Sequence, residues 1–198
     1  MKYLSVDIEA TGLKENDYLI EFGMIPFDTD TMSLNDDLAR NYYVVCPSFE
    51  ELKPSLDPWV IENNENIINQ AHKNGISIAD FQKKISEYVN DSEVLDYFFD
   101  GQKERISLFG KSVNSIDIPF LNRDLGWDFM KEHFHHRILD LSATARSLID
   151  LNMLPKQCDS GSGLMKYLGY GDVAHTALTD ARNTALMYLS ILEKFTRN

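Results

Sequence analysis

The stretch that decides the fold is "YLSVDIEATGLKENDYLIEFGMIPFD", Tyr3 to Asp28. It contains two apolar runs, residues 3–7 and 18–27, and the segment TGLKEND between them carries the Gly and Asn of a turn. A third run, residues 41–47, is rich in aromatic and β-branched residues and stops at a proline. Three strands joined by short loops predict an antiparallel meander at the start of the chain.

The rest of the chain alternates between helical and strand patterns. Residues 49–104 are polar and mostly helical in pattern, with apolar residues at helical spacing over 78–89. Strands are expected at 105–110 and 137–141, each followed by a helical segment, and the last helix spans about 176 to 195. This order predicts an α/β fold around a mixed five-stranded sheet. With no repeat or linker, residues 1–198 are expected to form one domain.

The formal net charge is −12. Proteins that hold long nucleic acids usually neutralise many phosphates with Lys and Arg. A nucleic-acid role here therefore requires a short substrate, bound cations or a local basic patch, for which Lys103, Arg105, Lys111 and Arg123 are the candidates. Composition alone favours a small-molecule enzyme or an acidic interaction module.

Other bulk features point to a cytoplasmic location. No segment approaches the ~20 consecutive apolar residues that a membrane span needs. The first residues, MKYLSVD, reach an aspartate before a signal-peptide apolar region could form. Cys46 and Cys158 lie far apart, which fits a reducing compartment.

Two carboxylates, Asp7 and Glu9, stand where the first strand ends. Residues i and i+2 of a strand project from one face, so these like charges would repel each other unless a cation lies between them. Oxygen ligands of this kind suit Mg²⁺ or Mn²⁺. Asp91 and Glu93 have the same spacing in a polar connection and are expected to be solvated. Spacing alone thus leaves two interpretations, solvent-facing acids or a metal site.

Further candidate ligands occur later in the chain. Asp117 follows the strand at 105–110, and Asp180 falls in the first turns of the last helix. Both residues could equally be acids favoured at the start of a helix. His175 precedes Asp180 by five residues, and an imidazole beside a carboxylate–metal site can take a proton from water because its pKa lies near neutrality.

Taken together, the segments "DIEATGL", "NSIDIPFL" and "HTALTDA" resemble the three motifs of the DEDDh 3′→5′ exonucleases, of the ribonuclease H-like superfamily. Their order and internal spacing match. The resemblance implies a ribonuclease H-like fold and two Mg²⁺ or Mn²⁺ ions held by Asp7, Glu9, Asp117 and Asp180. It also implies that His175 is the general base. By the same resemblance, the terminal nucleotide would meet Thr11, Gly12 and Leu13, and Asn114 and Phe120 match positions near the site.

Other segments resemble particular branches of this family. Residues 133–148 and 56–63 resemble oligoribonucleases, whereas residues 164–169 are more similar to ribonuclease T and proofreading-subunit exonucleases. A protein of charge −12 also loses least binding affinity to electrostatic repulsion when its substrate is a very short RNA, because few phosphates need to be neutralised. The preferred hypothesis is an oligoribonuclease-like enzyme that releases nucleoside 5′-monophosphates from short single strands.

Two alternatives remain: a DNA 3′→5′ exonuclease that proofreads or trims ends, and a catalytically silent nucleic-acid-binding module. The resemblance also suggests a homodimer. Trp59 is expected in the core rather than as a platform for stacking bases.

Overall fold

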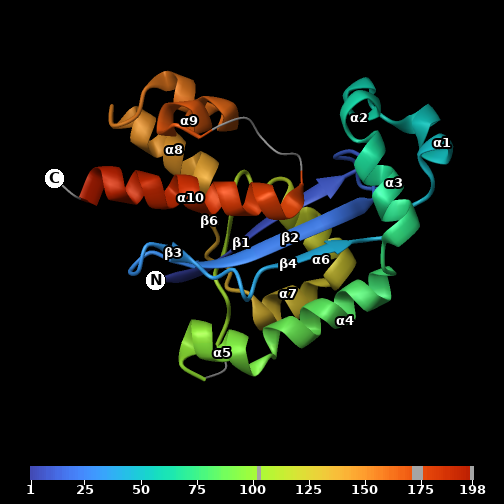
Figure 1. Cartoon of the computed structure of the whole chain (residues 1–198), viewed down its shortest axis with the longest axis horizontal. Coiled ribbons are helices and arrows are strands. Elements are labelled where there is room, and N and C mark those ends of the chain that lie inside the picture. Colours follow the sequence, from blue (N-terminus) through green and yellow to red (C-terminus); the bar gives the residue numbers. More distant parts are fainter. Residues whose placement is uncertain (102–103, 171–175, 197–198) are drawn as a thin grey trace.

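The computed structural model describes residues 1–101, 104–170 and 176–196. A central sheet has helices on both faces (Figure 1). Its two long strands are β1 (Lys2–Ala10) and β2 (Leu19–Asp28), which pair antiparallel so that Glu9 lies opposite Glu21. The predicted pairing of these two apolar runs across a short loop is confirmed.

The remaining strands complete a mixed sheet. β5 (Leu108–Gly110) lies parallel to β1, and β6 (Leu139–Asp140) lies parallel to β5. On the other side, β2 pairs antiparallel with β3 (Ser33–Leu34) near its end and with β4 (Arg40–Tyr43) near its start. This arrangement confirms the predicted α/β class with antiparallel strands first and parallel strands after.

The strands differ from the prediction in length and in one addition. β4 and β5 are shorter than predicted because Val44 and Ile106 form only isolated bridges, with Ile76 and Phe134 respectively. The sixth strand, β3, was not predicted, since two residues carry no measurable alternation.

Helices fill most of the chain between and after the strands. The middle region, predicted to be mostly helical, contains α1 (Phe49–Leu52), the 3₁₀ turn η1 (Lys53–Ser55), α2 (Pro58–Asn63), α3 (Glu65–Asn74), α4 (Ile78–Val89) and α5 (Ser92–Phe99). The later helices are α6 (Asp117–Leu125), α7 (Trp127–His133), α8 (Leu141–Asp150), the 3₁₀ turn η2 (Lys156–Asp159), α9 (Gly161–Leu168) and α10 (Ala177–Thr196). Among the described residues, none of these helices is both long enough and apolar enough to cross a bilayer.

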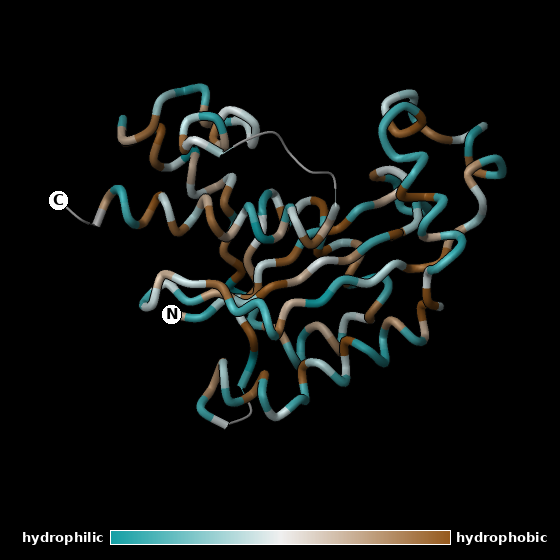
Figure 2. Tube along the Cα trace, viewed as in Figure 1, coloured by the Kyte–Doolittle hydropathy of each residue, from teal (hydrophilic) through white to brown (hydrophobic). Residues whose placement is uncertain are grey.

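The alternation of β1 separates two layers of helices. Leu4, Val6 and Ile8 pack in one apolar cluster with residues of α4 and α6. The intervening residues face α10, where the Ser5 hydroxyl donates to the Ala181 carbonyl at 2.7 Å. In Figure 2 hydrophobic and hydrophilic residues alternate along α4, as expected for a helix with one buried side. Asp7 and Glu9 therefore share a face with α10.

A separate apolar cluster joins α1 and α3 to β2 through Ile20, Phe49 and Ile68. It holds the segment containing η1 and α2 near the C-terminal end of β1. The buried Asn64 reinforces this placement by donating from its side chain to the Ala10 carbonyl at 3.5 Å.

Candidate active site

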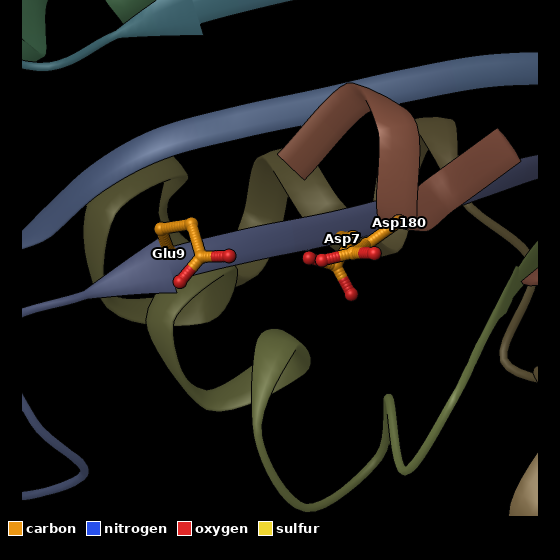
Figure 3. Close-up of side chains that lie close together, drawn as sticks. All are labelled: Asp7, Glu9 and Asp180. Atoms are coloured by element: carbon orange, nitrogen blue, oxygen red, sulfur yellow. The ribbon is translucent and has the colours of Figure 1, made fainter. Parts of the chain in front are cut away.

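Three carboxylates meet at the C-terminal part of β1. Asp7 and Glu9 from β1 and Asp180 from the first turn of α10 each offer an oxygen, and these oxygens lie within 4.8 Å of one another (Figure 3). We call these three residues the acidic group. The first and third sequence motifs, more than 160 residues apart, are thus brought together.

Two residues of β2 place α10 so that Asp180 reaches β1. Gly23 lies directly against the backbone of Ala177 and Leu178, where a side chain would not fit. The carboxylate of Glu21, only 1% exposed, accepts the Ala177 N–H at 3.0 Å and the Asn41 amide at 2.6 Å. Glu21 was missed in the sequence analysis, although an ionisable residue inside an otherwise apolar strand was the available signal.

Asp117 lies beside the acidic group from another direction. It is the first residue of α6, is 3% exposed and accepts the backbone N–H of Ile8 at 3.0 Å. The negative charge of Asp117 helps to raise the pKa of Asp7. The second sequence motif therefore also lies near the end of β1.

The electrostatics of these acids are unfavourable without a cation. Burial, followed by the charges of Asp117, Glu9 and Asp180, raises the pKa of Asp7 well above its usual range. Burial and the charge of Asp180 raise the pKa of Glu9 to about 7. Burial likewise raises the pKa of Asp117 to about 7. Lys111 acts in the opposite direction and lowers the pKa of all three carboxyl groups.

Such a cluster suits hard divalent cations. All of its donors are carboxylate oxygens, the ligand type that Mg²⁺ and Mn²⁺ prefer. A cation would also relieve the mutual repulsion that raises these pKa values. The residues present therefore fit a divalent metal centre.

The loop after β1 is tightly built. The buried Thr11 accepts the Tyr18 N–H on its hydroxyl at 2.8 Å and donates its own N–H to the Tyr18 carbonyl at 2.9 Å. Gly12 lies against the carboxylate of Asp17, which accepts the Lys14 N–H at 2.7 Å. The hydroxyl of Thr11 is thus hydrogen-bonded within the loop, whereas the side chain of Leu13 is 73% exposed.

A hollow of about 700 Å³ adjoins the acidic group on the side of Glu9. Its walls are the loop with Leu13 and the segment 55–60, and Trp59 lies in it. The prediction that Trp59 is a core residue is wrong, because this side chain is 55% exposed. The reason is local: Asp57 accepts the Trp59 N–H at 2.9 Å and caps α2, so the tryptophan occupies the first turn of a short surface helix.

The remaining predicted site residues are Asn114, Phe120 and His175. Asn114 is exposed in the turn after β5. Phe120 is buried in the apolar cluster, where the Arg123 guanidinium lies 4.7 Å from its ring centroid. His175 lies outside the described residues.

Comparison with known proteins adds a family match. The model of the RNase_T family, described as Exonuclease, matches residues 4–188. No curated protein sequence matches the chain.

Several solved structures share the fold over nearly the whole chain. The nuclease domain of 3′hExo, a DEDDh family member bound to rAMP, has a TM-score of 0.67 at 18% identity, covering 98% of this chain and 92% of that one. S. pombe Pop2p in its Mg²⁺- and Mn²⁺-bound form has a TM-score of 0.70 at 15% identity, with 98% and 84% covered. E. coli ExoI in its metal-free complex with single-stranded DNA has a TM-score of 0.70 at 17% identity, with 99% of this chain but 40% of that one covered.

Proposed function

The chain belongs to the RNase_T exonuclease family, and on that premise we propose that it is a metal-dependent 3′→5′ exonuclease. Its substrates would be short single-stranded oligonucleotides, preferably RNA, and its products nucleoside 5′-monophosphates. Residues 1–198 would act as a single exonuclease domain.

The observation that carries this proposal is the acidic group at the edge of the hollow. Three carboxylates converge within 4.8 Å, and Glu9 belongs both to this group and to the wall of the hollow. A nucleotide in the hollow would therefore present its phosphate to the acidic group. This juxtaposition supports hydrolysis at the phosphate that joins the last nucleotide to the strand.

Asp7, Glu9, Asp117 and Asp180 would hold Mg²⁺ or Mn²⁺, two ions per site. When bound, these cations supply Lewis-acid polarisation of the phosphodiester and a water nucleophile at neutral pH. Asp117 is oriented for this task by the Ile8 N–H, and Asp180 by the placement of α10 on Glu21. His175, five residues before Asp180, would accept the proton of the attacking water.

The hollow would bind the terminal nucleotide. Leu13 and Trp59 are exposed side chains on its walls, so a base placed there would contact an aliphatic and an aromatic surface. Stacking of a base on an aromatic ring is worth about 1–3 kcal/mol and tolerates any base. Thr11 and Gly12 line the hollow, so their backbone would meet the 3′ end, and Asn114 would lie along the strand. Phe120 would act from the core by supporting α6.

The preference for short substrates rests on charge. Each phosphate that lacks a cationic partner is repelled by a protein of net charge −12. A dinucleotide brings few phosphates beyond the one at the acidic group. Among proteins of similar fold, 3′hExo is described bound to rAMP and ExoI bound to single-stranded DNA, which supports a nucleotide or a single strand as the ligand.

The experiment is a parallel digestion with Mg²⁺ of a 5′-labelled RNA dinucleotide, a 5′-labelled RNA decamer and a long single-stranded DNA. We expect stepwise shortening of the decamer from its 3′ end and the highest kcat/KM on the dinucleotide. Faster degradation of long DNA would replace the RNA preference with the DNA-exonuclease alternative. Internal cleavage, or no cleavage of any of the three, would refute the exonuclease proposal itself.

A further inference from the structure

Lys111 lies at the acidic group on the side away from the hollow with Trp59. It directly follows β5 and lines a second, smaller hollow of about 60 Å³ together with Asp7 and Asp180. The two hollows have no lining residue in common. The acidic group therefore separates two openings, one walled by Leu13 and Trp59 and the other by Lys111.

The ammonium group of Lys111 is not engaged elsewhere in the described part of the chain. No residue there forms a hydrogen bond with it or an ion pair of 4 Å or less. The other candidates from the sequence differ: Arg123 pairs with Asp124 at 2.6 Å and donates to two carbonyls, and Arg105 lines separate hollows. Lys103 lies outside the described residues.

The first residue of α9 makes room for this ammonium. A Cβ on Gly161 would lie 2.7 Å from the Lys111 Nζ and 3.0 Å from its Cδ. A side chain at position 161 would press against the end of the Lys111 side chain and shift its ammonium. The glycine thus keeps a flexible cation beside three carboxylates.

We infer that Lys111 is a substrate-binding residue whose ammonium contacts a phosphate of the strand on the 5′ side of the scissile bond. This inference rests on the proposed function. With the terminal nucleotide in the larger hollow, the strand continues past the acidic group toward the smaller one. A polyanion that leaves through an opening lined by Asp7 and Asp180 needs a cation there, and Lys111 is the cation among the described residues that line it.

The test measures binding of a fluorescent single-stranded RNA tetramer by anisotropy, with Ca²⁺ replacing Mg²⁺ because it takes the same oxygen ligands. Kd is determined between about 50 and about 200 mM salt, the range in which phosphate contacts lose affinity steeply. The variants are Lys111→Met, Lys111→Arg and Gly161→Ala, and Lys166→Met, which removes an exposed lysine from the same helix α9, is the matched control.

We expect Lys111→Met to weaken binding about tenfold at the lowest salt, as for loss of one charge-assisted hydrogen bond. The slope of log Kd against log salt should fall by about 0.7, the contribution of one phosphate contact to a single strand. Lys111→Arg should retain the slope. Gly161→Ala, which keeps the charge but displaces the ammonium, should weaken binding in the same direction, and Lys166→Met should change neither quantity.

An unchanged slope and Kd in Lys111→Met would overturn the inference. If Lys111→Met does not fold, Lys111→Gln takes its place, and an unchanged slope and Kd in that variant would overturn the inference. A wild-type protein that binds the tetramer with the Lys111-dependent slope but does not hydrolyse it with Mg²⁺ would refute the proposed function and leave only the contact between Lys111 and a phosphate standing.

Discussion

Replacing Glu9 with glutamine is expected to stabilise the metal-free protein while removing part of its active site. Burial and Asp180 raise the pKa of Glu9 from 4.5 to about 7. At about 1.4 kcal/mol per pH unit, the charged form of Glu9 costs the folded state about 3 kcal/mol at pH 8. Glutamine has nearly the same shape and no charge, so most of this cost disappears.

The pH dependence follows from the direction of the shift. The folded protein holds the Glu9 proton up to pH of about 7 and the unfolded chain releases it near 4.5, so the folded state binds more protons between these values. The free energy of unfolding of the wild type therefore falls as pH rises through this window and levels off above it. The advantage of Glu9→Gln is greatest at pH 8 and nearly absent at pH 4.5.

The assay is thermal unfolding in EDTA at both pH values. Allowing for the cost of burying an amide, we expect a gain of about 1–3 kcal/mol at pH 8. For a chain of this size, 1 kcal/mol shifts Tm by about 2–4 °C, so the gain corresponds to roughly 2–12 °C. Glu62→Gln, which removes an exposed acid from α2, corrects for the change in net charge.

Excess Mg²⁺ should raise the Tm of the wild type and reduce the advantage of Glu9→Gln, because cation binding stabilises the folded state that has the intact ligand set. A Glu9→Gln variant that is no more stable than wild type at pH 8 in EDTA would refute the electrostatic reasoning. The same would follow from a gain of equal size at pH 4.5.

Three further predictions concern single positions. Asp7→Asn should fold, melt higher than wild type in EDTA and lose hydrolysis by orders of magnitude, whereas Asp91→Asn, on an exposed helix cap, should keep full activity in the same assay. Glu21→Ala should lower the free energy of unfolding by about 1–3 kcal/mol in urea titrations, since it leaves the Ala177 N–H without its acceptor; a loss under about 0.5 kcal/mol would contradict its role in placing α10. Trp59→Ala should raise KM about tenfold with little change in kcat, as for loss of one stacked base, and Trp127, which is also exposed, should tolerate alanine; equal effects at both tryptophans would contradict the stacking role.

Most of the fold could be predicted because its main signals are local. The apolar runs of β1 and β2 and the loop between them specify the antiparallel pair, and the periodicity of α4 specifies its buried side. Gly126 and Gly169 have positive φ and follow the last residues of α6 and α9, as is common for glycine at a helix C-terminus. Strand lengths were less predictable, because bridges such as that of Ile106 with Phe134 depend on partners distant in sequence.

The acidic group could be predicted because each carboxylate lies at the end of an element whose direction the sequence indicates. Asp91 shows the limit of such spacing arguments. It shares the Asp-x-Glu pattern with Asp7, yet it caps α5 by accepting the N–H groups of Glu93 and Val94.

The walls of the site were harder to predict. The exposure of Trp59 depends on how the α1–α3 segment docks against β2, and the role of Glu21 depends on where α10 begins. Both features arise from contacts between segments far apart in the chain. Lys111 was one of four candidate cations in the sequence, and its position beside Asp7, Asp180 and Gly161 distinguishes it.

The central claim is that the acidic group is a metal-dependent phosphodiesterase centre. The most direct test incubates wild-type and Asp7→Asn protein with a short single-stranded RNA and Mg²⁺, with and without excess EDTA, and quantifies released nucleoside 5′-monophosphate by chromatography. We predict release by the wild type with Mg²⁺ alone, and none with EDTA or with Asp7→Asn. Equal release by both proteins, or release by the wild type that persists in EDTA, would contradict the claim.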